Sequence, residues 1–353
     1  MENIIRTGII GYGLSGRVFH APFVDVVEGL ELSKISTSDP KKISLAKEKY
    51  PHTTIVGDAK NIVEDPEIDL IIVASPNTVH FHWAKEALLA NKHVVVEKPF
   101  TVNYAEAQEL VELSKQKNKI LSVYHNRRFT SDTRTVKKIL TSGILGDVVD
   151  YETHFDRFRP DPKGVMAWRE ESLPGSGIFH DLGSHLIDQS LYFFGVPLAV
   201  TANITRMRTW SKANDSFDIW LHYPTHKAIL KSSILAKMPG PTYQIHGTKG
   251  SFIKYGLDVQ EEHLDRGDIP NTSDWGKEPE SIWGTMKTEY EGVEMTSIVE
   301  SENGDYRDYF INLRDAIWGK CDLAVTAEEG ANVMKIIDLA FQSDKEKRTV
   351  EVK

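Results

Sequence analysis

The chain has 353 residues, with 42 Lys or Arg and 51 Asp or Glu, so its formal net charge at pH 7 is −9. This length favours two domains, and the acidic balance argues against nucleic-acid binding, which needs a basic face. The sequence contains no run of about 18 apolar residues, so no membrane span is predicted, and no signal peptide is evident. The single cysteine, Cys321, excludes an internal disulfide framework. A cytoplasmic protein is therefore expected.

The N-terminal segment predicts a dinucleotide-binding strand, loop and helix. Residues 4–10 have the apolar pattern of a parallel strand, and a helical stretch follows at 17–27. In the G-x-G-x-x-G loop between them, the first glycine allows a tight turn, the second lets the backbone approach a pyrophosphate, and the third allows close packing. A strand, turn and helix without nucleotide would give the same pattern. The residues predicted to bind the cofactor here are Gly11, Tyr12, Gly13, Leu14, Ser15 and Gly16.

The end of the second strand, predicted at 30–36, bears on the choice between NAD and NADP. An NAD-binding unit carries an Asp or Glu there that hydrogen-bonds the ribose, whereas this chain has hydroxyl residues followed by lysines. That pattern would accept the 2′-phosphate of NADP, so NADP is predicted over NAD. Asp39 could still serve as the acid, and the lysines could be the solvated face of a helix at 40–50. The residues predicted to surround the phosphate are Ser36, Thr37, Ser38 and Lys41.

Strands and helices continue to alternate up to Tyr124. Further strands are predicted at 54–56, 70–73, 94–96 and 120–124, and further helices at 61–64, at 78–90 and after Asn103, where Glu106 completes a capping box. This alternation predicts an α/β fold with a doubly wound parallel sheet, a Rossmann domain covering 1–124.

The strand at 94–96 ends on Glu97, Lys98 and Pro99. A carboxylate and an ammonium at the carboxyl end of such a strand lie where α/β sheets bind ligands. The proline ends the strand, and its X-Pro bond is the only kind that readily becomes cis. The simpler interpretation is a turn with two solvated charges.

The pattern changes after residue 124. Alternating segments joined by Gly and Pro turns predict an α+β domain at 125–353 with a large, mostly antiparallel open sheet. Its strands are predicted at 148–158, 199–208, 216–222, 228–235, 243–247 and 251–254. Its helices are predicted at 132–141, about 178–194 and about 327–342, the last packing back near the domain junction. Residues 256–305 are polar and give little prediction.

The helical segment at 178–194 carries a candidate acid–base pair. Asp181 and His185 are four residues apart and share a helix face, and a histidine beside a carboxylate suits a general base. Gly183 costs about 1 kcal/mol relative to alanine in a helix interior, which makes sense if something flat approaches that turn. An ordinary surface pair is the alternative. A metal site that adds His180 and Asp188 is disfavoured, because His180 and His185 do not share a face.

Two further segments are candidates for substrate binding. Asn126, Arg127 and Arg128 follow the last parallel strand and could hold a hydroxyl-rich or anionic substrate, or part of the nucleotide. Arginines that bridge the two domains explain the same residues nearly as well. Trp168 could line a sugar-sized pocket, or it could belong to the core.

Together, the glycine loop, Glu97-Lys98-Pro99 and Asp181-x-x-x-His185 resemble the Gfo/Idh/MocA family, the glucose–fructose oxidoreductase and inositol dehydrogenase group. The resemblance covers essentially the whole chain. It implies that Lys98 binds and polarises the reacting oxygen, that His185 accepts the proton with Asp181 beside it, and that the bond before Pro99 is cis. The residues that it places beside the cofactor are Ser75, Pro76, Asn77, His80, Glu97 and Lys98.

Residues 11–22 and 124–129 narrow the resemblance to the branch of NADP-dependent scyllo-inositol 2-dehydrogenases. This implies hydride transfer between NADP and a secondary alcohol of a cyclitol or sugar, with scyllo-inositol as the best expectation. A dehydrogenase of a sugar, either a pyranose or a pentose, or a non-catalytic NADP-sensing regulator, stays open as an alternative. A homodimer or homotetramer through the second sheet is also expected, because an open sheet exposes an apolar face that must be covered.

Overall fold

The computed structural model describes residues 4–162 and 170–353, which form two compact units. The first unit comprises the chain up to Asn126, Gln260–Trp275 and Asp305–Ala331, and the second comprises Arg127–Val259, Gly276–Gly304 and Asn332–Lys353. The predicted division into 1–124 and 125–353 places its break close to the first observed one. It assigns to the second domain, however, two later segments that pack within the first unit.

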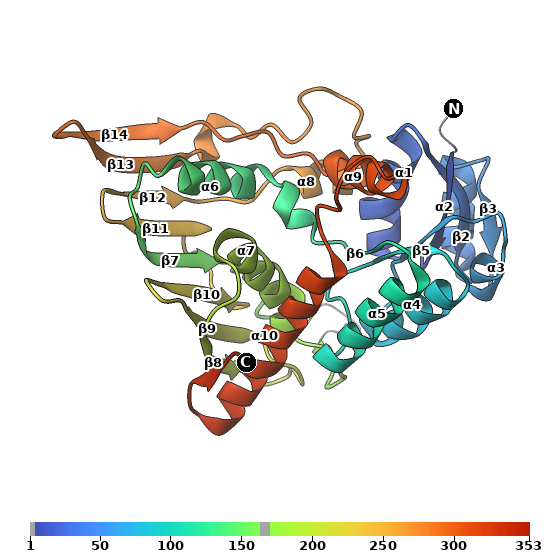
Figure 1. Cartoon of the computed structure of the whole chain (residues 1–353), viewed down its shortest axis with the longest axis horizontal. Helices are drawn as coiled ribbons and strands as arrows, with labels where there is room; N and C mark the ends of the chain where they lie inside the picture. The colour runs from blue at the N-terminus through green and yellow to red at the C-terminus, as the bar shows by residue number, and fades with distance from the viewer. Residues whose placement is uncertain (1–3, 163–169) are drawn as a thin grey trace. The chain divides into compact units, whose positions relative to one another are not determined.

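The first unit contains a six-stranded parallel sheet in the order β3-β2-β1-β4-β5-β6 (Figure 1). Its strands are β1 (Ile5–Ile10), β2 (Leu30–Ser36), β3 (Thr54–Val56), β4 (Leu70–Val73), β5 (His93–Val96) and β6 (Leu121–Val123). Every residue of β4 and all but the first of β5 are buried, as expected of strands covered on both faces. The predicted Rossmann sheet is confirmed, and its order places the carboxyl ends of β1 and β4 at the switch point where such sheets bind ligands.

The helices of the first unit lie close to the predicted positions up to residue 117. They are η1 (Gly16–His20, π-helical), α1 (Ala21–Val26), α2 (Pro40–Lys49), α3 (Lys60–Val63), η2 (Asn77–Val79, a 3-10 turn), α4 (His80–Leu89), α5 (Tyr104–Lys117), α8 (Gln260–Arg266) and α9 (Arg307–Ile317). The predicted cap at Asn103 is present, since its Oδ1 accepts the Glu106 N–H at 3.0 Å. Helices α8 and α9 were not predicted. The buried stripe of Tyr309, Phe310 and Leu313 is the signal that would have indicated α9.

The second unit contains a nine-stranded sheet in the order β14-β13-β12-β11-β7-β10-β9-β8-β15. Its strands are β7 (Val148–His154), β8 (Ala199–Thr205), β9 (Ser216–His222), β10 (Lys227–Ser233), β11 (Tyr243–Gly247), β12 (Gly250–Lys254), β13 (Gly284–Tyr290), β14 (Val293–Val299) and β15 (Val350–Glu351). All neighbouring strands are antiparallel except β7 and β10, which are parallel. The mostly antiparallel sheet is therefore confirmed, and the hairpin of β13 and β14 lies in the polar region that gave no prediction.

Two strands of this sheet end three or more residues earlier than predicted. β7 ends at His154 rather than at residue 158, and β8 ends at Thr205 rather than at residue 208. An aspartate near each end bonds a backbone N–H group. Asp156 accepts from Ser233 at 2.9 Å, and Asp215, just before β9, accepts from Met207 at 2.6 Å. Local side-chain bonds of this kind compete with regular strand pairing, and alternation alone does not reveal them.

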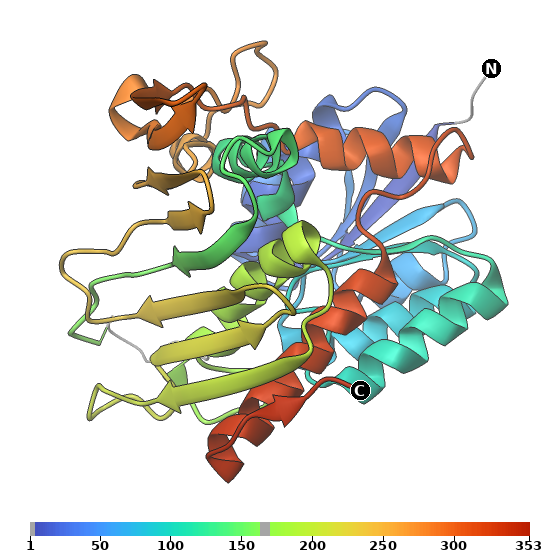
Figure 2. The same ribbon diagram turned by 60° about the vertical axis from the view of Figure 1, so that its left-hand side comes forward.

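Helices cover one face of the second sheet (Figure 2). The helical segments assigned wholly or partly to this unit are η3 (Asn126–Phe129), α6 (Ser131–Ser142), η5 (Phe179–Gly183, π-helical), α7 (Ser184–Phe194), η6 (Glu280–Ile282) and α10 (Ala327–Glu346). Tyr151 of β7 packs edge-on against Phe194 of α7, with ring centroids 5.2 Å apart. Phe179 contacts both Phe217 of β9 and Phe341 of α10. These aromatic contacts form the core between the sheet and its helices.

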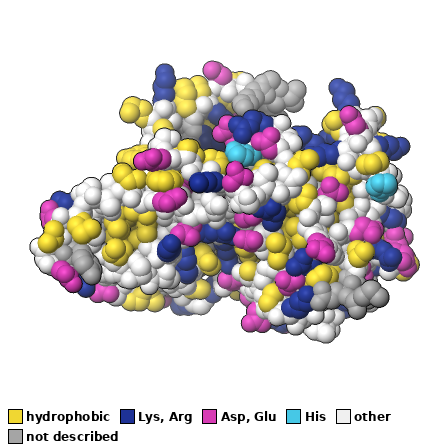
Figure 3. All heavy atoms as spheres, turned by 90° about the horizontal axis from the view of Figure 1, so that it is seen from above, with side chains coloured by type: hydrophobic (Ala, Val, Ile, Leu, Met, Phe, Trp, Pro, Cys, Tyr) yellow, Lys and Arg dark blue, Asp and Glu magenta, His cyan; other side chains and the backbone are white. Residues whose placement is uncertain are grey.

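Acidic, basic and apolar side chains are interspersed over the face of the molecule in Figure 3. Isolated apolar side chains are ordinary at a protein surface. No helix within the described parts of the chain is both long and apolar enough to cross a membrane.

Candidate active site

The three glycines of the loop after β1 have different surroundings. Gly11 has a φ of +97°, and a Cβ there would lie 2.7 Å from the Ala74 carbonyl oxygen. A Cβ at Gly16 would lie 2.1 Å from the Gly11 carbonyl oxygen. A Cβ at Gly13, in contrast, would have no atom within 4 Å among its described surroundings. Packing within the chain therefore requires Gly11 and Gly16, whereas Gly13 borders open space.

The residues after β2 hold the loop and begin the next helix. Ser36 accepts the Gly11 N–H through both its hydroxyl and its carbonyl oxygen, each at 3.3 Å. The Asp39 carboxylate accepts the Lys41 N–H at 2.9 Å at the start of α2, and this bond lowers the pKa of Asp39. Thr37 is half-buried, while the predicted neighbours Ser38 and Lys41 are exposed. The one acid near the end of β2 is thus engaged as a helix cap.

Glu97 connects the glycine loop to the turn after β5. Its carboxylate accepts hydrogen bonds from the Ser15 hydroxyl, from His20 Nε2 at 2.8 Å and from the Lys98 N–H at 3.0 Å. Burial by itself would raise the pKa of Glu97, but the hydrogen bond and charge of His20, the Ser15 hydroxyl and the Lys98 charge lower it to about 2. The carboxylate is therefore ionised at neutral pH.

The Lys98–Pro99 peptide bond is cis, as the resemblance implied, and the Lys98 side chain is half-buried. His80 connects this turn to the loop after β4, because its ring nitrogens lie 3.0 Å from the Pro99 carbonyl oxygen and 2.9 Å from that of Ser75. Burial lowers the pKa of His80. The loops after β1, β4 and β5 are thus joined through two buried side chains, Glu97 and His80.

Two features of this region are not explained by contacts among the residues that the structure describes. One is the open space at Gly13. The other is the Ser75 hydroxyl oxygen, which is buried and has no hydrogen-bond partner among the described residues. A pyrophosphate on the loop and a polar nucleotide atom beside Ser75 would account for both, so the residues fit a dinucleotide. Among the other predicted neighbours, Asn77 is buried, whereas Leu14 and Pro76 are exposed.

Tyr12 lines a hollow of about 550 Å³ beside the loop. Arg17 and Pro22 of the following helical segments, Lys49 of α2 and Arg266 of α8 also line it. Burial raises the pKa of Tyr12, so its hydroxyl stays protonated at neutral pH. The tyrosine side chain therefore packs beside the loop, among residues outside the predicted cofactor set.

In the second unit, the predicted acid–base pair spans two types of helix. Asp181 lies half-buried in the π-helical turn η5, and His185 is buried in the first turn of α7. The predicted helical segment at 178–194 is present, but its first turn is π-helical, so the two residues do not lie within one regular α-helix. A Cβ at Gly183 would lie 2.5 Å from the Phe179 ring. The flat group that requires this glycine is therefore the chain's own phenylalanine. π-Helical turns of this kind are frequent at functional sites.

Phe155, just after β7, brings two of the predicted site residues to one ring. The His185 ring is stacked on Phe155, with centroids 6.2 Å apart and planes inclined by 25°. The Arg127 guanidinium lies 4.4 Å from the centroid of the same ring, within cation–π distance. Sequence reasoning did not assign Phe155 to the site, because its alternation with neighbouring residues does not show which face meets the helix.

Arg128 and Asp188 form a buried ion pair within the second unit. The Asp188 carboxylate accepts from Arg128 Nη2 at 2.7 Å and from Nε at 3.0 Å, and both side chains are almost fully buried. The Arg128 guanidinium also lies 5.0 Å from the Tyr192 ring centroid. These contacts fix α7, so packing accounts for the position of Arg128. Asn126 is buried at the start of η3, and Trp168 lies outside the described residues.

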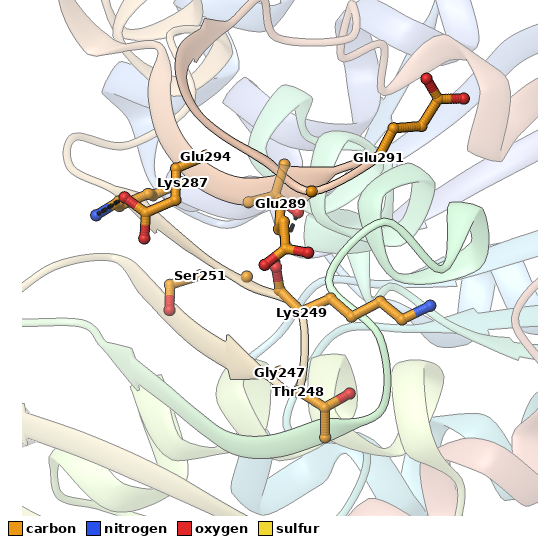
Figure 4. Close-up of a pocket in the computed structure, with 11 residues that line it drawn as sticks. Gly247, Thr248, Lys249, Ser251, Lys287, Glu289, Glu291 and Glu294 are labelled. Carbon is orange, nitrogen blue, oxygen red and sulfur yellow. Dashed lines mark hydrogen bonds and ion pairs between the residues drawn. The ribbon is translucent and has the colours of Figure 1, made fainter.

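A separate hollow of about 670 Å³ lies between the β11–β12 turn and the hairpin of β13 and β14 (Figure 4). Lys249, Lys287 and Glu289 are among its lining residues, and Lys287 Nζ lies 3.1 Å from a Glu294 carboxylate oxygen. None of the predicted site residues lines it. Among residues 4–162 and 170–353, no group of three or more His, Cys, Asp or Glu side chains is placed to hold a metal ion.

Two family models match the chain. Residues 5–125 match the model described as "Oxidoreductase family, NAD-binding Rossmann fold", and residues 137–352 match "Oxidoreductase family, C-terminal alpha/beta domain". Both descriptions agree with the two sheets described above.

Similar proteins cover nearly the whole chain. The uncharacterized oxidoreductase YdgJ of Escherichia coli K12 is 42% identical over 99% of both chains. The scyllo-inositol 2-dehydrogenase (NADP(+)) IolW of Bacillus subtilis 168 is 40% identical over 98% of this chain and 95% of its own. The solved structure of the oxidoreductase yvaA from Bacillus subtilis is 40% identical, with a TM-score of 0.96 over 100% of this chain and 99% of that one.

Proposed function

Because the chain belongs to the Gfo/Idh/MocA family of oxidoreductases, we propose that it is an NADP-dependent dehydrogenase of a cyclitol or sugar. The reaction interconverts a secondary alcohol and the corresponding ketone. Scyllo-inositol is the first substrate to test, because the similar protein IolW is named as a scyllo-inositol 2-dehydrogenase. The observation that carries the proposal is the ionised, buried Glu97, which joins the glycine loop to the backbone of Lys98.

The proposal assigns a role to each candidate side chain. Lys98 binds and polarises the reacting oxygen, and His185 takes the hydroxyl proton as a general base. Asp181 orients His185 and stabilises its charged form. Bound NADP supplies a nicotinamide that accepts the hydride from the alcohol carbon. In the direction of ketone reduction, His185 returns the proton to the oxygen.

The preference for NADP rests on the residues after β2. Asp39 caps α2 and lies 3.6 Å from Lys42 Nζ, so its carboxylate already has partners. Thr37 stands where an NAD-binding unit would carry an acid. A 2′-phosphate beside Thr37 would therefore meet a hydroxyl group and nearby lysines rather than an unpaired carboxylate.

The test combines a substrate panel with variants of the two reacting groups. NADP and NAD absorbance changes are measured with scyllo-inositol, other inositols, pyranoses and pentoses. Lys98→Ala and His185→Ala should each lower kcat by roughly 10²–10⁴-fold, while the Kd for NADPH stays within about threefold of wild type. The exposed residues Lys47 and His52 provide matched control variants, Lys47→Ala and His52→Ala, which should leave kcat unchanged.

Near-wild-type turnover in both site variants would contradict the assigned mechanism. Activity on a pyranose or pentose but on no inositol would replace the substrate and keep the reaction. Tight NADPH binding without turnover on any member of the panel would instead favour a cofactor-sensing regulator.

We also propose a homodimer or homotetramer through the second sheet. Its supporting observations are Trp220 of β9, at 45% exposure, and Ile298 of the edge strand β14, at 58%. The strand register places both side chains on one face of the sheet. An open sheet face and an edge strand are surfaces that a second copy of the chain can cover. Light scattering should give a mass of two or four chains, and Trp220→Glu should shift it towards one. A monomeric wild type would contradict this proposal.

A further inference from the structure

His20, at the end of η1, is buried and has no role in the mechanism above. Its side chain is 0% exposed, and its Nε2 lies 2.8 Å from Glu97 Oε1. The imidazole ring packs against Tyr124, with centroids 4.4 Å apart, and edge-on against Phe310 of α9 at 6.0 Å. These rings fix the direction in which the histidine presents Nε2.

The Glu97 carboxylate determines which ring nitrogen of His20 carries a proton. An ionised carboxylate can only accept a hydrogen bond, so the nitrogen that faces it, Nε2, must donate. Nδ1 is buried and has no hydrogen-bond partner among the described residues. His20 therefore donates its Nε2–H to the Glu97 carboxylate.

Glu97 needs that donor because it is an ionised group in a buried place. Its oxygens are bonded by Ser15 and His20 side chains and by the Lys98 N–H, and the Lys98 charge also lowers its pKa. The other titratable groups that feel its charge are His80, Tyr124 and Tyr309. Among the titratable groups around Glu97, His20 is the one whose ring nitrogen contacts the carboxylate and whose position is fixed by aromatic packing.

We propose that His20 is a positioning residue, whose Nε2–H holds the Glu97 carboxylate in the orientation that joins the glycine loop to the backbone of Lys98. This inference rests on the proposed function, since it concerns how the cofactor loop and the oxygen-polarising lysine are held in register. Without the bond, Glu97 loses one of the donors that keep it ionised and fixed. Both the affinity for NADPH and the placement of Lys98 should then suffer.

Variants of the full-length protein separate the hydrogen bond from the packing. His20→Phe keeps an aromatic ring but removes the donor, whereas His20→Gln places an amide N–H near the position of Nε2. His20→Phe should weaken NADPH binding roughly tenfold and lower kcat/KM roughly a hundredfold, because small misplacements of reacting groups are costly. His20→Gln should recover most of both losses. His52→Phe is the matched control at an exposed position.

The pH dependence gives a readout that packing alone would not move. In the wild type, the pKa of Glu97 is lowered, so the carboxylate stays ionised down to acid pH. Removing the His20 donor should raise that pKa, so the acid limb of NADP⁺ binding should move to higher pH. In a Glu97→Leu background, which has no acceptor for the His20 N–H, His20→Phe should cause no further loss of affinity.

The NADPH titration tests this inference even if no polyol or sugar is turned over, which keeps its failure distinct from that of the proposed function. Unchanged Kd and acid limb in folded His20→Phe, with only a lower Tm, would overturn it. Equal losses in His20→Gln and His20→Phe, or additive losses with Glu97→Leu, would also overturn it. If His20→Phe does not fold, His20→Asn replaces it, because its shorter amide does not reach Glu97 and the same loss is expected.

Discussion

Two π-helical turns occur among the described residues, and each leads directly into an α-helix. η1 follows the glycine loop in the first unit, and η5 carries Asp181 in the second. Each also contains a glycine that touches its own chain, since a Cβ at Gly16 would meet the Gly11 carbonyl oxygen at 2.1 Å and one at Gly183 would meet the Phe179 ring at 2.5 Å. In local geometry the two turns are closely comparable.

The surroundings of the two turns differ in what the chain leaves unexplained. In the first unit, the open space at Gly13 and the buried hydroxyl of Ser75 have no internal explanation. In the second unit, Gly183 and Arg128 suggested a ligand in the sequence, but Phe179 and Asp188 account for them. A residue type thus points to a ligand most strongly where internal packing does not already require it. Four substitutions test this distinction.

The largest effect is expected at Arg128. Because its ion pair with Asp188 already accounts for its position, its replacement should lower stability rather than substrate affinity. Arg128→Met leaves the Asp188 carboxylate buried without its bidentate partner, which should lower the free energy of unfolding by about 3–5 kcal/mol. Urea unfolding measures the loss, and the double variant Arg128→Met/Asp188→Leu should recover most of it. A raised substrate KM at unchanged stability would instead make Arg128 a substrate-binding residue.

Gly13→Ala should show the opposite behaviour. Apart from its chain neighbours, no atom of residues 4–162 and 170–353 lies within 4 Å of the added methyl group, so the Tm should stay within about 2 °C of wild type. Displacing the pyrophosphate should cost one or two charge-assisted hydrogen bonds of about 1.5–3 kcal/mol each, which corresponds to a roughly hundredfold weaker Kd for NADP. Gly16→Ala is the matched comparison, because it should lower both Tm and affinity. Tight NADP binding by folded Gly13→Ala would remove the argument from open space.

The sequence predicted the parallel sheet of the first unit more completely than the sheet of the second, for physical reasons. Parallel strands buried on both faces, such as β4, are continuous apolar runs, and their carboxyl ends meet at one edge of the sheet. Glu97 and the glycine loop could therefore be placed together from their strands alone. His20 was missed because its partner Glu97 is distant in sequence, and the stacking of His185 on Phe155 was missed because alternation does not show which face a helix covers.

Gly183→Ala tests the π-helical turn η5 through the sign of its effect on the free energy of unfolding. Helix propensity alone would predict stabilisation by about 1 kcal/mol. The added methyl group would lie 2.5 Å from the Phe179 ring, and overpacking of this kind should instead destabilise the protein by about 1–3 kcal/mol. Phe179→Leu, although destabilising alone, should reduce the further cost of Gly183→Ala in the double variant. A more stable Gly183→Ala would show that the glycine is not kept for Phe179.

The smallest effect concerns the end of β2, where one acid is engaged by the chain and a second can be introduced. Thr37→Asp places a carboxylate where the 2′-phosphate is proposed to lie, so the ratio of kcat/KM for NADP to that for NAD should fall about tenfold, equivalent to about 1.4 kcal/mol.

Asp39→Ala is the control. Because Asp39 caps α2 through the Lys41 N–H, its loss should cost about 1 kcal/mol of stability and leave the cofactor ratio unchanged. If the single variant Asp39→Ala lowers kcat/KM with NAD, Asp39 contacts the ribose, and its hydrogen bond to the Lys41 N–H does not exclude a role in cofactor binding. If Thr37→Asp changes kcat/KM with neither cofactor, the 2′-phosphate lies elsewhere. The argument for NADP from the end of β2 then fails, while the argument from the glycine loop stands.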